Sequence, residues 1–191
     1  KQVVDVRDGE IMFGLNMVVH KGKTIFVGDT SVHEYPTSEQ MAEIAISTAR
    51  VVRLFGFEPK VAFVSHSTFG QPLTSRTKHI RKAVDILKEQ KVDFEFDGDM
   101  QPDVALNSEY EELYPFSNIV GKANILIMPG QHSAAISYKM MKTLGDTKVI
   151  GPLLIGLGLP VEIAPLRSST SELINLASIA AYSADIIDYK K

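Results

Sequence analysis

The chain has no cysteine and no tryptophan among its 191 residues. Without cysteine it can form no disulfide, thiolate nucleophile or thiolate metal site, as expected for a cytoplasmic protein. No apolar run reaches the ~18 residues of a membrane-spanning helix, because glycine and proline interrupt the longest one, Val149–Ile163. The formal net charge is only −3, and no basic stripe marks a nucleic-acid surface. We therefore expect a cytoplasmic protein that contacts neither a membrane nor nucleic acid.

The composition that remains is that of a folded domain. Hydrophobic residues make up 45% and charged residues 23% of the chain, which is the usual balance of a globular protein. The chain begins with Lys1 rather than Met, and its first residues lack the apolar stretch of a signal peptide. We expect a piece of a longer protein.

Apolar residues follow two spacings in turn along the chain. Short β-forming runs predict strands, and recurrence every three to four residues predicts helices, the first of which Thr37 or Ser38 can cap. Their alternation indicates a three-layer α/β/α fold with a mainly parallel sheet, made mixed by an opening hairpin around Lys21–Lys23. The predicted strands are residues 12–19, 24–27, 61–64, 92–96, 124–128 and two short ones within 149–163, and the predicted helices are 38–55, 76–91, 133–144 and 169–189.

The loop after the third predicted strand, Ser65–Gln71, is a candidate ligand site. In open α/β sheets, ligands bind beyond the carboxyl ends of the strands. The hydroxyls of Ser65, Ser67 and Thr68 and the backbone N–H groups around Gly70 suit a phosphate or pyrophosphate. The alternative is a polar turn built from residues that favour loops.

Two further loops follow predicted strands. Gly130–Ser133 opens a helix, whose N-terminal N–H groups suit an anion; the alternative is an ordinary serine cap. Asp97 and Asp99 flank a glycine and offer carboxylates for a cation or a proton. This pattern is more often a turn that ends a strand, and no third hard ligand follows nearby. We therefore predict no metal site.

Three segments, in order along the chain, resemble the phosphotransacetylase family. Residues 29–45 (DTSVHEYPTSEQMAEIA) are similar to that family's Asp-Thr/Cys-x-Val-Asn-x-x-Pro turn and the helix with Ala-Glu-Ile-Ala that follows it. Residues 97–106 (DGDMQPDVAL) resemble its Asp-Gly-x-x-Gln-x-Asp-x-Ala-Leu stretch, and residues 151–157 (GPLLIGL) resemble its Gly-Pro-Ile-Leu-x-Gly-Leu stretch. The likeness runs along nearly the whole chain.

Other segments resemble a narrower group, the C-terminal phosphotransacetylase-like domain of bacterial hybrid NADP-dependent malic enzymes. Residues 65–70 (SHSTFG) are similar to the Ser-His-Ser-Asn-Phe-Gly of that domain, where phosphotransacetylases more often have Ser-Tyr-Ser-x-x-Gly. Residues 114–117 (YPFS) and 128–137 (MPGQHSAAIS) also resemble that domain. In such proteins the domain follows an N-terminal malic enzyme.

The resemblance implies a two-part module with an isocitrate/isopropylmalate dehydrogenase-like fold. Residues 1–165 would form its second subdomain, and residues 166–191 a C-terminal helix that returns to a first subdomain absent from this chain. The malic enzyme, with its NADP and divalent metal, would also lie outside the chain. The same resemblance implies a homo-oligomer that dimerises through this module.

The segment before the last predicted helix departs from the family pattern. Phosphotransacetylases carry Ser-Arg-Gly there and an Asp further on; the Ser and Asp are linked to catalysis, and the Arg to binding the acyl phosphate. Aligned without a gap, Pro165 and Leu166 replace Ser-Arg, and Glu172 replaces the Asp. With Arg167 paired to the family Arg, Leu166 replaces the Ser and Leu173 the Asp. The Ser is lost in both alignments, so we expect no catalytic residue here.

We therefore expect a regulatory module that binds acetyl-CoA as an effector and helps to assemble the enzyme. One alternative is an active phosphate acetyltransferase that moves acetyl between CoA and phosphate, and another is a purely structural assembly domain. By loop position and family likeness, the predicted acetyl-CoA-binding residues are Ser65, His66, Ser67, Thr68, Gln101, Ser133 and Pro152.

Overall fold

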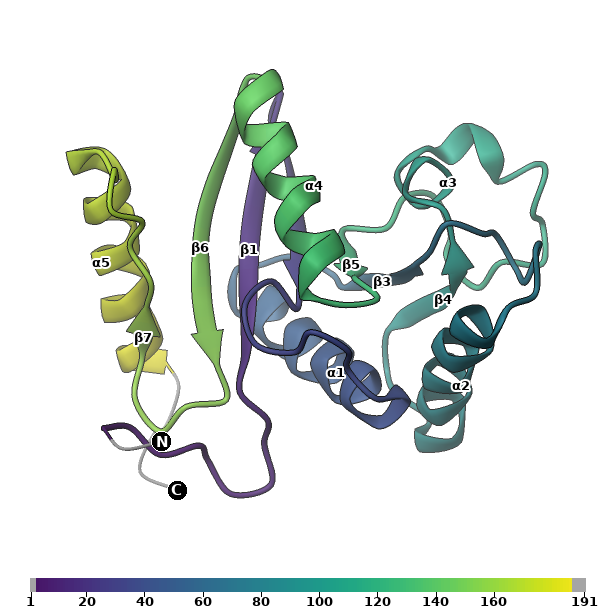
Figure 1. Cartoon of the computed structure of the whole chain (residues 1–191), viewed down its shortest axis with the longest axis horizontal. Helices are drawn as coiled ribbons and strands as arrows, with labels where there is room; N and C mark the ends of the chain where they lie inside the picture. The colour runs from purple at the N-terminus through teal and green to yellow at the C-terminus, as the bar shows by residue number, and fades with distance from the viewer. Residues whose placement is uncertain (1–2, 187–191) are drawn as a thin grey trace.

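Seven strands form one sheet in the order β4-β3-β5-β2-β1-β6-β7 (Figure 1). The structure, a computed structural model, describes residues 3–186. Strands β2, β5, β3 and β4 run parallel to one another, whereas β1 is antiparallel to both β2 and β6. The strands are β1 (Phe13–His20), β2 (Lys23–Gly28), β3 (Lys60–Val64), β4 (Glu95–Met100), β5 (Ile125–Ile127), β6 (Thr147–Ile155) and β7 (Val161–Glu162).

Helices cover both faces of this sheet. Helices α1 and α2 lie on one face, α3 and α4 lie on the other, and α5 runs beside β6 and β7 (Figure 1). The three-layer α/β/α fold is thereby confirmed. None of the described helices has the length and apolar character needed to cross a bilayer. The helices are α1 (Ser38–Leu54), α2 (Ser75–Gln90), α3 (Pro102–Leu106), α4 (Gln131–Leu144) and α5 (Thr170–Ile186), with a 3₁₀ turn at Ser108–Tyr110.

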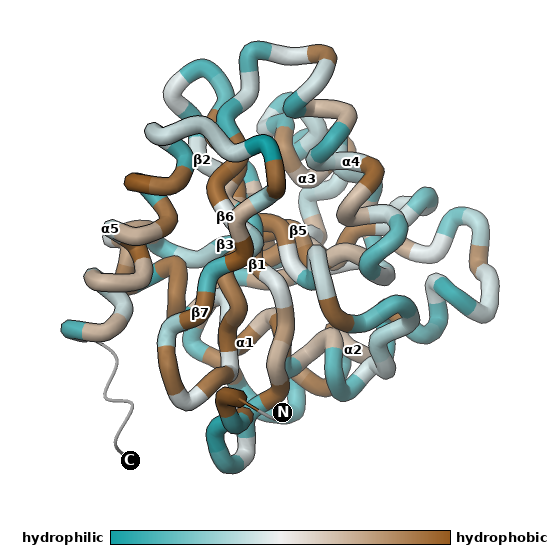
Figure 2. The backbone as a smooth tube through the Cα atoms, turned by 60° about the vertical axis from the view of Figure 1, so that its left-hand side comes forward, coloured by the Kyte–Doolittle hydropathy of each residue, from teal (hydrophilic) through white to brown (hydrophobic). Residues whose placement is uncertain are grey.

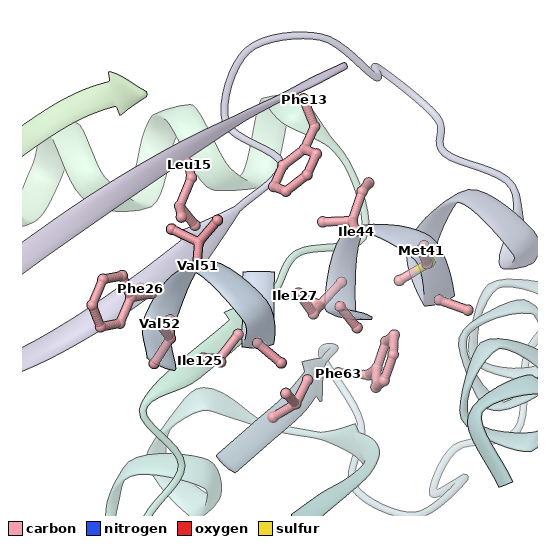
Figure 3. Close-up of a cluster of buried hydrophobic side chains, with 14 of the residues drawn as sticks. Phe13, Leu15, Phe26, Met41, Ile44, Val51, Val52, Phe63, Ile125 and Ile127 are labelled. Carbon is pink, nitrogen blue, oxygen red and sulfur yellow. The ribbon is translucent and has the colours of Figure 1, made fainter. Parts of the chain in front are cut away.

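The core has two halves, one on each face of the sheet. Along β3, Val61 and Phe63 belong to the half under α1 and α2, while Ala62 and Val64 belong to the opposite half. Successive strand residues point to opposite faces, so both faces of this apolar strand are covered. Figure 3 shows the α1 half, where Ile44 of α1 lies over the sheet. Figure 2 shows the apolar stretches concentrated in the strands.

The predicted hairpin at the start of the sheet is confirmed. Strands β1 and β2 pair from Leu15↔Gly28 to His20↔Lys23. Lys21 and Gly22 join them with φ values of 47° and 75°. Positive φ at both central residues is what a type I′ hairpin turn requires.

The turn predicted at Asp97–Asp99 is wrong, because these residues lie inside β4, where Asp97 and Gly98 pair with β3. Gly98 makes this possible. Its φ is +152°, and a Cβ there would lie 2.7 Å from the carbonyl oxygen of Phe63. The missing side chain lets the two backbones approach, and the ladder shifts register between Phe63 and Val64. The strand therefore continues to Met100 and carries Asp99 into the interior.

The last helix begins at Thr170, one residue after its predicted start, and its predicted end at residues 187–189 lies outside the described residues. Within this chain α5 contacts β6 and β7. Tyr182 also donates a 3.0 Å hydrogen bond to the carbonyl oxygen of Leu54 at the end of α1. The division into residues 1–165 and a helix that returns to another subdomain stays a prediction.

Candidate functional site

The parallel strands β2, β5, β3 and β4 end on the same side of the sheet, which we call the carboxyl edge. Backbone hydrogen bonds join the segments that leave them. Met128 N–H donates to Gly28 O over 2.6 Å, and Ser65 N–H donates to Met100 O over 2.9 Å. Ligands of open α/β sheets bind beyond such ends, so this edge is the first place to look for a site.

A row of polar side chains runs from the interior to the surface at this edge. Ser67 Oγ donates a short hydrogen bond to Asp99 Oδ2, and both residues are buried. Ser65 Oγ lies 3.3 Å from Ser67 Oγ and 3.4 Å from Nδ1 of the exposed His66. Asp99 Oδ1 is buried and has no hydrogen-bond partner among the described residues. We call these four residues the polar row.

The loop of β3 is also bonded to the end of β4. Gln101 N–H donates to Thr68 Oγ1 over 3.2 Å, and Phe69 N–H donates to Asp99 O over 2.6 Å. Gln101 precedes α3, and its side chain makes no capping bond to that helix. The structure thus brings together five of the predicted binding residues, namely Ser65, His66, Ser67, Thr68 and Gln101.

Asp29, which sequence reasoning did not single out, organises the loop after β2. Its buried Oδ1 accepts from the backbone N–H groups of Gly14, Ser31 and Val32 at 2.8–3.1 Å. Its Oδ2 accepts from His33 N–H and contacts His33 Nδ1, both at 2.7 Å. A carboxylate that accepts this many bonds fixes the path of the loop. The only signal in the sequence was its place in the family-like turn.

The start of α4 is held to that same loop. Gln131 N–H donates to His33 O over 3.0 Å, and its side-chain amide donates to Ser31 O over 3.2 Å. Ser133 Oγ donates to Gly130 O over 2.8 Å, so its proton is used within its own turn. Ser133 therefore lies at the carboxyl edge, after β5, but it is not hydrogen-bonded to the polar row in the described structure.

Pro152 lies elsewhere. It is part of β6, and three strands, β5, β2 and β1, separate β6 from β3. Pro152 lines a hollow between α4 and the start of α5 together with Tyr138, Lys142 and Pro165. The predicted binding residues therefore occupy two regions of the fold, the carboxyl edge and this hollow.

Residues 164–169, where we predicted that the family's Ser-Arg-Gly is replaced, lie beside the same hollow. Ser168 Oγ donates to Pro165 O over 2.8 Å, and the Leu166 side chain is fully exposed. Glu172 accepts a 2.8 Å bond from Ser169 N–H and another of 2.8 Å from Lys142 Nζ. The hydrogen bond from Lys142, followed by those from Ser169, lowers the pKa of Glu172 to about 2. Glu172 is thus a capping and ion-pairing residue.

A second unusual carboxyl group lies under the other end of α5. Glu162 of β7 lines a hollow with Arg7, Phe55 and Tyr182. Burial raises its pKa to about 8, and its Oε2 has no hydrogen-bond partner among the described residues. Nothing in the sequence marks this Glu, because a short edge strand gives no sign of what covers it.

No cluster of three or more His, Asp or Glu side chains suited to a metal occurs within residues 3–186. Asp97, one of the two carboxylates considered for a cation, is engaged in the fold. Its Oδ1 accepts from Gly98 N–H at 2.9 Å and its Oδ2 accepts from Asn118 N–H at 2.7 Å.

The fold and the carboxyl edge together define the class of protein. It is an α/β protein whose sheet has helices on both faces and polar loops where its parallel strands end. The family model described as Phosphate acetyl/butaryl transferase matches residues 1–181, and the chain belongs to this family. The resemblance seen in the sequence is thereby confirmed.

Individual proteins that are similar to this chain support the same family assignment. An NADP-dependent malic enzyme of Rhizobium meliloti is 46% identical over 184 residues, which cover 96% of this chain and 24% of that protein. A phosphate acetyltransferase of Clostridium acetobutylicum is 35% identical over 162 residues, covering 84% of this chain and 49% of that protein. A phosphotransacetylase structure from Streptococcus pyogenes superposes with a TM-score of 0.89 at 30% identity, covering 96% and 57% of the two chains. The chain spans about a quarter of the length of the malic enzyme.

Proposed function

We propose that this chain is a regulatory acetyl-CoA-binding module of a hybrid NADP-dependent malic enzyme of the cytoplasm and helps to assemble it as a homo-oligomer. The chain is 46% identical to a malic enzyme, and the match covers only 24% of that protein's length. This supports the place of the chain in a longer protein. An N-terminal part would then oxidise and decarboxylate malate to pyruvate with NADP and a divalent metal. This chain would supply the effector site.

The observation that carries the proposal is the segment before α5. In the alignment without a gap, Pro165 and Leu166 stand where the family pattern has Ser-Arg; with Arg167 paired to the family Arg, Leu166 stands in place of the Ser. Glu172, in the first turn of α5, is engaged by Ser169 and Lys142. A group that stabilises developing charge in a transition state contributes several kcal/mol, and neither a proline ring nor an exposed leucine can do so. The polar loops of the carboxyl edge are retained, which favours binding without turnover.

Feedback inhibition of malate oxidation by acetyl-CoA would give such a module a role. Acetyl-CoA lies downstream of malate oxidation through pyruvate, so inhibition by acetyl-CoA would match supply to demand. Regulation requires that acetyl-CoA bind two conformations of the protein with different affinity, because a ligand with equal affinity for both shifts nothing.

Two measurements on the complete protein test the proposal. We expect calorimetry to detect acetyl-CoA binding, and we expect no conversion of acetyl phosphate and CoA into acetyl-CoA. Absence of binding would overturn the effector role and favour a structural one. Binding by the complete protein that is lost in the 191-residue chain alone would show that the absent first subdomain supplies part of the cleft.

The second candidate is an active phosphate acetyltransferase. The 35% identity to a phosphate acetyltransferase favours it. Turnover of acetyl phosphate within about tenfold of an active family member, which is about 1.4 kcal/mol of barrier, would establish this function and remove the proposal of a silent module.

A third candidate is a purely structural assembly domain. Apolar side chains exposed on α4 favour it, because large exposed apolar patches often mark protein contacts; they are Ile136, Met140, Met141 and Leu144. An unchanged oligomeric state after deletion of residues 169–191 would count against an assembly role of the last helix.

A further inference from the structure

The hydrogen bond from Ser67 to Asp99 favours one direction for the protons of the polar row. A serine hydroxyl carries a single proton, and that of Ser67 is donated to the carboxylate of Asp99. Ser67 Oγ can therefore only accept from Ser65 Oγ, 3.3 Å away. With the Ser65 proton directed inward in this way, Ser65 Oγ can only accept from His66 Nδ1, 3.4 Å away.

This direction favours the neutral tautomer of His66 that carries its proton on Nδ1. A neutral imidazole that donates from Nδ1 carries no proton on Nε2, which is then an acceptor. The His66 ring is exposed, whereas Ser67 and Asp99 are buried. The buried carboxylate thereby favours, through two hydroxyl groups, Nε2 of a surface histidine as the acceptor. Contacts of 3.3–3.4 Å are long for hydrogen bonds, and such contacts commonly shorten when a ligand closes the site.

Three further groups of the loop are already engaged in hydrogen bonds within the fold. Thr68 Oγ1 already accepts from Gln101 N–H. The N–H groups of Ser65 and Phe69 donate to Met100 O and Asp99 O. The buried carboxylate of Asp99 adds negative charge at the inner end of the row, and it repels a phosphate in a region of low dielectric. The two serine hydroxyls that the sequence offered as phosphate ligands have their protons directed inward.

We propose that the polar row presents His66 Nε2 as a hydrogen-bond acceptor for an amide N–H of the pantetheine arm of the effector. This rests on the proposed function, which supplies the CoA thioester as ligand. His66 is a binding residue in this assignment, and Asp99, Ser67 and Ser65 are positioning residues that act through it.

The tautomer is measured without any ligand. Solid-state NMR of the complete protein with ring-¹⁵N histidine, compared with its His66→Gln variant, isolates the His66 signals. We expect a protonated Nδ1 and a bare Nε2 in the wild type, and loss of that preference in Ser67→Ala, which breaks the row without changing charge. A protonated Nε2 in the neutral wild-type ring would overturn the proposal.

The ligand group is assigned by affinity. Acetyl-CoA contains the pantetheine amides, whereas adenosine 3′,5′-bisphosphate has the adenine, ribose and phosphate groups of the nucleotide end and no pantetheine. We expect His66→Leu to weaken acetyl-CoA binding about fivefold to tenfold, as one lost hydrogen bond does, and to leave the bisphosphate affinity unchanged. His66→Gln keeps an acceptor near the Nε2 position and should restore most of the acetyl-CoA affinity.

The failures are distinguishable. If the wild type binds acetyl-CoA but His66→Leu binds it equally well, or loses bisphosphate affinity in parallel, the pantetheine assignment is wrong while the effector role stands. If the wild type does not bind acetyl-CoA, the effector role fails and the pantetheine assignment fails with it.

Discussion

Lys142 Nζ lies 2.8 Å from Glu172 Oε1, and this ion pair ties the last turn of α4 to the first turn of α5. Both residues line the hollow that contains Pro152. The pair therefore bounds the hollow on the side of residues 165–168.

The Lys142–Glu172 pair makes stability depend on acid pH. The pKa of Glu172 falls from 4.5 to about 2, mainly through the bond from Lys142. Ionised Glu172 therefore stabilises the fold above pH 4.5, and this contribution is lost as the pH falls through 2. We expect Lys142→Met to reduce the loss of thermal stability over that interval. Lys78→Met, at an exposed position of α2, should keep the wild-type slope; identical slopes for Lys142→Met and wild type would refute the link.

Glu162 gives the opposite pH dependence. Burial raises its pKa from 4.5 to about 8, so its stabilising contribution is complete below pH 4.5 and declines as the pH rises to 8. We expect Glu162→Gln to increase the free energy of unfolding near pH 8 by about 1 to 2 kcal/mol, a value reduced for the partial exposure of the side chain, and to have little effect near pH 4.

The control for Glu162 is Glu112→Gln, which removes an exposed carboxylate. It should change stability by less than about 0.5 kcal/mol at either pH. Urea unfolding at the two pH values measures both variants, and an equal effect of Glu162→Gln at both values would show that its carboxyl group is not buried in its neutral form.

Asp29→Asn tests the organisation of the loop after β2. The new amide group would turn an N–H donor toward groups that already donate to the carboxylate, among them His33 N–H at 2.7 Å. Leaving buried donors without an acceptor should cost about 2 to 4 kcal/mol, measured by urea unfolding. Asp8→Asn, at an exposed position, is the matched control and should be nearly neutral.

The apolar face of α4 predicts the oligomeric state. Met140 and Leu144 are 54% and 81% exposed, so replacing both with Lys should leave the stability of the fold nearly unchanged. We expect the double variant of the complete protein to lose subunits in sedimentation equilibrium. The control is a double variant with Lys in place of the exposed Leu113 and Val120, which should keep the wild-type oligomeric state. If both double variants have the wild-type oligomeric state, the exposed face of α4 is not the subunit contact.

The spacing of apolar residues alone was enough to predict most of the helices and strands. The apolar run that became β3 is covered on both faces, as a strand of continuous apolar residues should be. The cap of α1 was narrowed to Thr37 or Ser38, and the structure selects Thr37, whose side chain accepts from Gln40 N–H at 3.1 Å. Ser38 Oγ instead donates to His79 O on α2, a long-range contact that no local pattern encodes.

The site was predictable only where neighbouring strands are parallel. Thr68 and Gln101 meet because β3 and β4 end side by side, which the strand–helix alternation implies. Pro152 lies apart because the β1–β2 hairpin places two strands between β5 and β6. Four of the five contacts of Asp29 are to Ser31, Val32 and His33, two to four residues further along the chain, as is usual for an aspartate that begins a turn. Only the bond from Gly14 depends on the fold, and no local pattern predicts it.

Helix α4 joins the two regions that the predicted binding residues occupy. Its first turn is bonded to the loop after β2 through Gln131, and its last turn is bonded to α5 through Lys142. Its 14 residues make a stiff rod of about 21 Å, and Tyr138 midway along it faces the Pro152 hollow. The loop after β2 and the start of α5 are therefore connected through a single helix.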